Sequence, residues 1–237
     1  MKNWRDVQPD ISHLSAVHWG GLRPRDGSDP DDDRNRLTRL GGFARHALQG
    51  RKTSDHHRHD CKEQVYYILS GSGEVQFDGR RFPVESGDAV YLPSGLYHQM
   101  FNDMNESWLE HHVISMPVEE DGGEISIRNW RHANPQGDGA GAIRWHQLGP
   151  LGEGDSGCLR GMAFIDREAV QPQGRSAPRR HEDLEQVYYG LENSGVITVD
   201  GEEVPFTEGD MVHLLPGCEY SIANPNRHWV SYLIMAA

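Results

Sequence analysis

Apolar residues along this chain gather in short runs of four or five positions. Runs rich in β-branched and aromatic side chains occupy residues 65–69, 74–77, 89–92 and 196–199. Each is bounded by Gly, Pro or an Asp-Gly pair, the pattern of strands separated by tight turns. The pattern therefore predicts an all-β protein.

Two Asp-Gly pairs mark hairpins in this predicted fold. They are Asp78-Gly79 and Asp200-Gly201, each between two strand-like segments. A type I′ turn needs a positive φ angle at both central residues, and Asp and Gly tolerate that conformation. We therefore expect neighbouring strands to be antiparallel, as in a β-barrel or a β-sandwich.

The chain also repeats itself from end to end. The segment Glu63 to Tyr67 returns as Glu185 to Tyr189, and Gly87-Asp88 returns as Gly209-Asp210, both offset by 122 residues. Further upstream, Asn3-Trp4-Arg5 returns as Asn129-Trp130-Arg131. Self-similarity at a fixed offset is the signature of a duplicated structural unit. We place the boundary near residue 125, where Pro117, acidic residues and Gly122-Gly123 break the pattern, and predict one domain over residues 1–125 and another over 126–237.

Charge narrows the range of partners. The chain has 36 acidic and 23 basic residues and a formal charge of −13. This balance disfavours nucleic acids and anionic membranes, both of which attract clustered Lys and Arg. No segment approaches the roughly 20 apolar residues of a membrane span, and no signal peptide is apparent. We expect a cytoplasmic monomer or homodimer that acts on a small molecule.

Three histidines in the first unit have the spacing of metal ligands. His57 and His59 are two positions apart, so on a strand both side chains project from the same face. The Pro93-Ser94-Gly95 turn would bring His98 onto a neighbouring strand beside them. Imidazole nitrogens that converge in this way suit a first-row divalent metal.

These residues resemble the two motifs of the cupin superfamily. The second motif, G-x5-P-x-G-x2-H-x3-N, fits at every position from Gly87 through His98 to Asn102. The first motif, G-x5-H-x-H-x3,4-E-x6-G, fits at both histidines and at Gly71. The resemblance implies a bicupin, with two tandem jelly-roll β-barrels and one divalent Zn, Fe, Mn or Ni ion per chain.

The first motif departs from the family at its carboxylate. Counting back from Gly71 puts Gln64 in that position, and strand parity points Gln64, Tyr66 and Ile68 into the barrel and Glu63 outward. The predicted ligands are therefore His57, His59, Gln64 and His98. Because the shorter spacing also occurs in the family, Glu63 remains an alternative fourth ligand.

The second unit lacks this set of ligands. At the equivalent positions it carries Arg179, His181, Gln186 and Tyr220. A guanidinium stays protonated and repels a cation. We therefore expect the second barrel to be degenerate and free of metal.

The candidate chemistry is metal-assisted. The predicted function is a metal-dependent enzyme whose ion acts as a Lewis acid on a small polar or anionic molecule, in lyase, isomerase or ring-opening chemistry. Tyr66 and His111 are the candidate catalytic residues for proton transfer. Cupins that open unsaturated uronates are similar in their His-x-His-x4-Gln…His arrangement. An Fe(II)-dependent dioxygenase is the alternative, and a non-catalytic module that binds a sugar or an effector is the third hypothesis.

Overall fold

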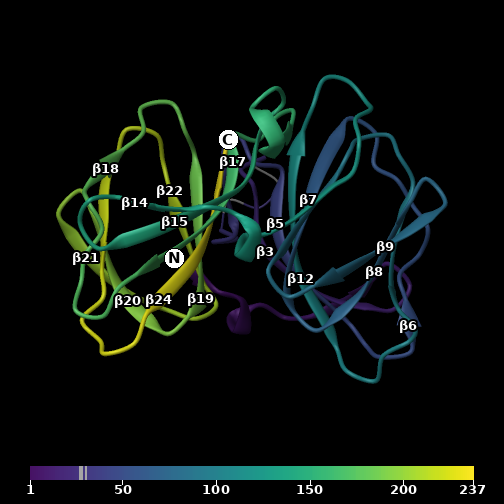
Figure 1. The fold of residues 1–237 in the computed structure, drawn as a ribbon, viewed down its shortest axis with the longest axis horizontal. Coiled ribbons are helices and arrows are strands. Elements are labelled where there is room, and N and C mark those ends of the chain that lie inside the picture. Colours follow the sequence, from purple (N-terminus) through teal and green to yellow (C-terminus); the bar gives the residue numbers. More distant parts are fainter. Residues whose placement is uncertain (27–28, 30) are drawn as a thin grey trace.

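The computed structural model describes residues 1–26, 29 and 31–237. It contains two β-barrels side by side, one drawn in blue and teal and the other in green and yellow (Figure 1). Three short 3-10 turns interrupt the strands, at η1 (Trp4–Asp6), η2 (Trp130–His132) and η3 (Gly154–Ser156). The prediction of two tandem, all-β barrels is confirmed. Within the described residues, no helix has the length and apolar character needed to cross a membrane.

The N-terminal barrel consists of a large and a small sheet. The large sheet has the order β13 (Ser126–Asn129), β10 (Asp88–Leu92), β7 (Lys62–Ser70), β12 (Leu109–Pro117), β5 (Gly42–Leu48), β3 (Ala16–Pro24) and β2 (Asp10–Ser12), with β4 (Asn35–Leu37) beside β3. The small sheet has the order β6 (Lys52–Thr53), β11 (His98–Asn102), β8 (Ser72–Phe77) and β9 (Arg80–Glu85).

The C-terminal barrel repeats this plan. Its large sheet has the order β1 (Lys2–Asn3), β22 (Asp210–Leu214), β19 (Gln186–Glu192), β24 (Val230–Ala236), β17 (Phe164–Val170), β15 (Ala142–Pro150) and β14 (Pro135–Gly137), with β16 (Gly157–Leu159) beside β15. Its small sheet has the order β18 (Arg179–Arg180), β23 (Glu219–Ala223), β20 (Ser194–Val199) and β21 (Glu202–Thr207). Asp78-Gly79 and Asp200-Gly201 have positive φ angles at the β8–β9 and β20–β21 hairpins, as predicted.

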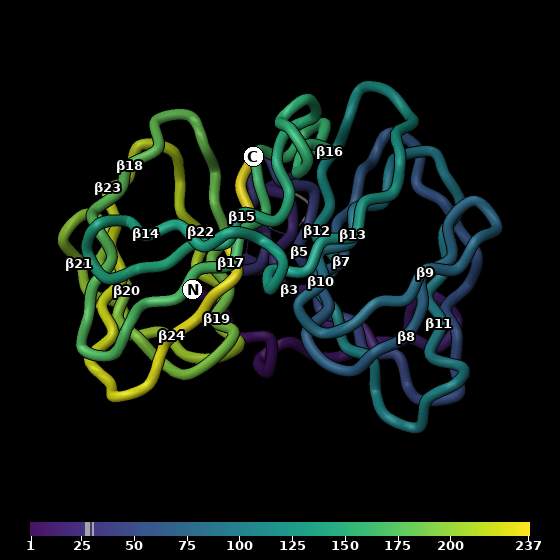
Figure 2. Tube along the Cα trace, in the orientation of Figure 1, coloured from purple at the N-terminus to yellow at the C-terminus, as the bar shows by residue number. Residues whose placement is uncertain are grey.

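The two repeat units exchange their first strands. Strand β1 pairs with β22 of the C-terminal barrel, and β13 pairs with β10 of the N-terminal barrel. The purple N-terminal segment accordingly starts in the green and yellow barrel and crosses to the other (Figure 2). Asn3 Nδ2 donates to Asp210 Oδ1 at 2.8 Å, and Asn129 Nδ2 donates to Asp88 Oδ1 at 2.9 Å. The proposed boundary near residue 125 thus separates repeat units whose sheets interlock, and it remains a prediction.

Strand β7 is buried on both faces, which explains its unbroken apolar run. Tyr66 and Ile68 pack in the core of the N-terminal barrel. Val65 and Tyr67 pack in a third core, which lies between the barrels and includes Val187 and Tyr189 of the other unit. Alternate residues of one strand therefore face the site and the interface, as strand parity predicts.

Candidate metal centre

Three histidines from two segments of the chain meet inside the N-terminal barrel. His57 and His59 lie between β6 and β7, and His98 is the first residue of β11. His57 and His98 exchange backbone hydrogen bonds of 3.1 and 2.8 Å, which hold the two segments together. One side-chain nitrogen of each of the three residues lies within 4.8 Å of the others. The structure thus brings the three predicted histidines together.

A glycine turn positions this pair of segments. Gly95 has a φ of 78°, and its N–H donates to the His59 carbonyl at 2.8 Å. An added Cβ at this position would come within 2.6 Å of Asp121. Only glycine adopts this conformation without strain and without a clash. The turn that the sequence indicated therefore anchors the histidine segment to the start of β11.

Hydrogen bonds select the tautomers of two of the histidines. Nδ1 of His57 lies 3.2 Å from the Asp55 carbonyl oxygen, and Nδ1 of His98 lies 3.3 Å from the Leu96 carbonyl oxygen. A carbonyl only accepts, so each Nδ1 carries the proton and each Nε2 keeps a lone pair. Nε2 of His57 and of His59 are buried and have no hydrogen-bond partner. Ligand atoms prepared in this way fit a divalent cation.

Gln64 and Glu63 occupy opposite faces of β7. Gln64 is 6% exposed, and its Oε1 is buried without a hydrogen-bond partner. Glu63 is 0% exposed and accepts hydrogen bonds of 2.8 Å from the backbone N–H groups of Arg160, Gly161 and Met162 in the other repeat unit. Because both carboxylate oxygens of Glu63 are occupied at the interface, Glu63 lies away from the histidines and Gln64 is the better candidate ligand.

Burial keeps the histidines neutral. It lowers the pKa of His59 to about 4 and that of His98 to about 3, and the neighbouring His57 acts in the same direction on both. The pKa of His57 is also lowered by burial and by the adjacent His13. Metal ligation requires neutral imidazole, so these residues are ready to bind an ion at neutral pH without releasing a proton.

Tyr66 and His111, the two candidate catalytic residues, lie beside the histidines. The Tyr66 hydroxyl is 3.2 Å from His98 Nε2 and donates to it. The His111 ring packs on the Tyr66 ring at a centroid distance of 4.8 Å, and its Nδ1 is buried without a partner. Burial raises the pKa of Tyr66 and lowers that of His111 to about 3. Tyr66 is therefore a proton donor at neutral pH, and His111 is a weak base.

Two further residues of this site, His13 and Asp55, were not predicted from the sequence. The His13 ring stacks on His57 at a centroid distance of 4.3 Å, and its Nδ1 is 3.1 Å from Asp55 Oδ1. Asp55 Oδ1 also lies 3.2 Å from His57 Nδ1, so the carboxylate bridges two imidazoles. His13 precedes β3, far from both cupin motifs in the sequence, and its only signal was the high histidine content of the chain.

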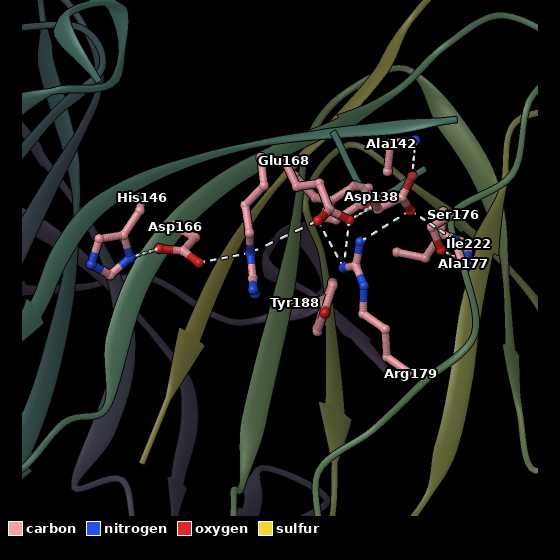
Figure 3. A network of polar contacts seen from close by, with 12 residues as sticks. Asp138, Ala142, His146, Asp166, Glu168, Ser176, Ala177, Arg179, Tyr188 and Ile222 are labelled. Atoms are coloured by element: carbon pink, nitrogen blue, oxygen red, sulfur yellow. Dashed lines mark hydrogen bonds and ion pairs between the residues drawn. The ribbon is translucent and has the colours of Figure 1, made fainter. Parts of the chain in front are cut away.

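The equivalent interior of the C-terminal barrel holds a network of ion pairs and hydrogen bonds (Figure 3). Arg179 stands in place of His57 and forms an ion pair of 2.7 Å with Glu168, and it also contacts Asp138 at 3.3 Å. The Tyr220 hydroxyl, in place of His98, donates to Gln186 Oε1 at 3.1 Å. Within the part of the chain that the structure describes, the groups of three or more potential metal ligands lie in the N-terminal barrel.

Solved structures with the same fold cover almost the whole chain. Bacterial pirin YhhW from Escherichia coli in complex with nickel(II) is 16% identical, with a TM-score of 0.75, over 99% of this chain and 96% of that chain. A variant of Bacillus subtilis oxalate decarboxylase is 12% identical, with a TM-score of 0.74, over 99% of this chain and 76% of that chain. At these identities the likeness concerns the fold alone.

Curated relatives match shorter segments. An oxalate-binding protein from Thermotoga maritima is 33% identical over 63 residues, which are 27% of this chain and 52% of that protein. An uncharacterized protein from Methanocaldococcus jannaschii is 39% identical over 46 residues, which are 19% of this chain and 37% of that protein. The matched segments thus span about half or less of the relatives' own length.

The sequence pattern of the Cupin domain matches this chain twice, over residues 45–113 and 166–234. The two matches fall on the two barrels and together cover more than half of the chain. The first includes the three converging histidines, and the second includes their substituted counterparts. The chain therefore belongs to the cupin family and is a bicupin.

Proposed function

We propose that the N-terminal barrel binds one divalent transition metal through His57, His59, Gln64 and His98. The observation that carries this proposal is the convergence of three imidazoles, whose ligand nitrogens lie within 4.8 Å of one another. Nε2 of His57 and of His59 are buried without hydrogen bonds, as is Oε1 of Gln64 on the inward face of β7. Leaving buried polar atoms unpaired costs about 1–3 kcal/mol each, and a bound cation would remove that cost. We assign Zn, Fe, Mn or Ni to this site, because nitrogen ligands suit these metals.

The protein then acts on a small polar or anionic molecule in lyase, isomerase or ring-opening chemistry. The metal would supply a Lewis acid that polarises a substrate oxygen. Tyr66 stays protonated, and once His98 Nε2 is engaged as a ligand the phenol has lost its acceptor. Its hydroxyl is then free to donate a proton or a hydrogen bond to the substrate.

His13 is the proposed proton acceptor of the site. Asp55 holds its Nδ1 at 3.1 Å, which leaves Nε2 as the basic atom. A carboxylate that fixes the tautomer of a histidine is the usual arrangement for a general base. His111, whose pKa burial lowers to about 3, is a poor base, and we assign it a hydrogen bond to the substrate.

Metal analysis of the purified protein tests the proposal. We expect one equivalent of transition metal per chain, together with turnover of one member of a panel of unsaturated uronates, hydroxy acids, β-dicarbonyls and sulfonio-acids. Two tightly held equivalents, or none after incubation with each of the four metals, would contradict the assignment.

A binding module without catalysis is the second candidate. It is favoured by the 33% identity over 63 residues to the oxalate-binding protein. Titration with oxalate separates the two: saturable binding without turnover of any panel compound supports the module. Tightly held iron with oxygen uptake would instead identify the Fe(II)-dependent dioxygenase. A cytoplasmic location and a monomeric or homodimeric state remain parts of the proposal.

A further inference from the structure

A second polar cavity lies between the two barrels, away from the candidate metal centre. It has a volume of about 220 Å³ and is lined by residues from both repeat units, among them Arg45, Tyr67, Glu110, Arg131, Arg167 and Tyr189. Several of these residues are repeat counterparts: Arg45 corresponds to Arg167, and Tyr67 corresponds to Tyr189. The cavity thus lies where the two units face each other, and its walls can be compared pair by pair.

The two tyrosines of this cavity differ in their hydrogen bonding. Tyr189 accepts a hydrogen bond of 3.1 Å from Arg45 Nη1. Tyr67 is 1% exposed, and its hydroxyl has no well-aligned hydrogen-bond partner. A buried polar group left unpaired in this way calls for a partner that the protein itself does not supply.

The two tyrosines differ because the arginines beside them have different partners. In the first unit Arg45 forms an ion pair of 2.6 Å with Glu110 and still reaches Tyr189. In the second unit Arg167 is held by Glu192 at 3.0 Å and by Ser231 at 3.1 Å. Both contacts use Nη2 of Arg167. The Arg167 side chain also lies near Tyr67, but the Tyr67 hydroxyl lacks a well-aligned hydrogen bond like the one that Tyr189 receives.

Three arginines and three glutamates line the cavity. Arg45 Nε is buried and has no partner. Arg131 stacks on Trp130 at 5.0 Å and donates to the Ser86 carbonyl at 2.8 Å, and the described residues place no carboxylate in an ion pair with it. Each of the three glutamates is already in an ion pair: Glu110 with Arg45, Glu192 with Arg167, and Glu208 with Arg5. The Arg45 Nε–H and the Tyr67 hydroxyl therefore lack an acceptor. The charge of Arg131 is hydrogen-bonded to the Ser86 carbonyl and to Asn129 Oδ1, both of which are neutral acceptors.

We propose that this cavity between the barrels binds a small oxyanion, which accepts hydrogen bonds from Tyr67, Arg45 and Arg131. An oxyanion offers several acceptor atoms at once, and hydrogen bonds from guanidinium groups to such anions are short and strong. A volume of about 220 Å³ accommodates a phosphate or a short dicarboxylate. The site is separate from the metal centre, because Tyr67 and Tyr66 point to opposite faces of β7.

Calorimetric titration of the full chain with inorganic phosphate and, separately, with malonate tests the proposal. We expect one site per chain, with affinity about tenfold weaker in Arg131→Gln and three- to tenfold weaker in Tyr67→Phe. The tighter of the two probes identifies the chemical source of the anion. Arg81→Gln is the matched control, because Arg81 pairs with Glu74 and Asp103 in the small sheet and should leave binding unchanged.

Two further measurements separate this site from the alternatives. Binding should persist in His59→Gln, and its loss there would place the anion at the metal centre and overturn the proposal. The same anion should raise the melting temperature of the wild type more than that of Tyr67→Phe. The proposal fails if neither probe binds saturably up to about 10 mM, or if both variants bind as the wild type does.

Discussion

The two barrels of this bicupin share one fold and differ in whether their interior polar groups have partners. Gln64 and Gln186 occupy equivalent positions, yet Oε1 of Gln64 has no hydrogen bond and Oε1 of Gln186 accepts one from Tyr220 at 3.1 Å. The N-terminal barrel leaves imidazole nitrogens free, and the C-terminal barrel pairs Arg179 with Glu168. The two interiors thus differ most at the positions of the histidines, which lack partners in one barrel and are replaced by an ion-paired arginine in the other.

The largest expected effect is the loss of metal from the N-terminal barrel. We expect His57→Ala combined with His98→Ala, or His59→Gln alone, to lower the metal content from about one equivalent to near zero, because each change removes imidazole ligands. Elemental analysis measures this, with His181→Gln in the other barrel as the matched control. Full retention of metal in the double variant would place the site elsewhere.

The next effect concerns the ion pair that fills the C-terminal barrel. We expect Arg179→Met to lower the free energy of unfolding by about 3–5 kcal/mol, because it removes the nearer of the two cations paired with the fully buried Glu168 and leaves only Arg144 at 3.8 Å. Adding Glu168→Leu should restore much of that loss, and metal content should not change in either variant. Urea denaturation measures the free energy, and a loss of metal in Arg179→Met would show that the barrels are coupled.

Glu185, at the interface between the barrels, should make the stability of the protein depend on pH. Burial by itself would raise the pKa of Glu185, but hydrogen bonds from His213 and from the backbone N–H groups of residues 38–40 outweigh it and lower the pKa to about 2, from 4.5. A lowered carboxyl pKa stabilises the fold above the unfolded value, and this contribution disappears as the pH falls from about 4.5 to about 2.

Glu185→Gln should therefore be less stable at neutral pH, on the order of 3 kcal/mol, with the difference shrinking over that acid range. Denaturation midpoints measured at several pH values test this. A difference that stays constant down to pH 2 would mean that Glu185 is not the group that titrates.

The smallest effects distinguish Gln64 from Glu63 as ligand. We expect Gln64→Glu to keep its metal and to change turnover, because an added carboxylate charge weakens the Lewis acid. Glu63→Gln should leave the metal content and turnover unchanged and lower only the free energy of unfolding, because Glu63 accepts hydrogen bonds from backbone N–H groups at the interface. If Glu63→Gln instead empties the site while Gln64→Ala does not, the ligand register is off by one residue.

Much of the fold was present in the sequence as local pattern. Strand alternation, the Asp-Gly turns and the repeat predicted the barrels, because strand faces and tight turns depend on neighbouring residues. The spacing of His57, His59 and His98 likewise predicted their convergence, since the turn at residues 93–95 just before His98 is short and ends in a glycine with a φ of 78°. Strand parity likewise predicted that Tyr66 and Ile68 pack inside the barrel, and the assignment of Gln64 as a ligand remains a prediction.

What the sequence did not reveal depends on segments that meet only in the folded protein. These contacts are the exchange of β1 and β13, the use of Glu63 at the interface and the stacking of His13 on His57. They join residues that are 35 to 209 positions apart in the sequence. No local periodicity encodes such pairings, because long-range contacts depend on how whole sheets pack. The sequence by itself therefore determined the two barrels and the candidate ligands, and the tertiary structure decided which polar groups found partners and which remained free for a ligand.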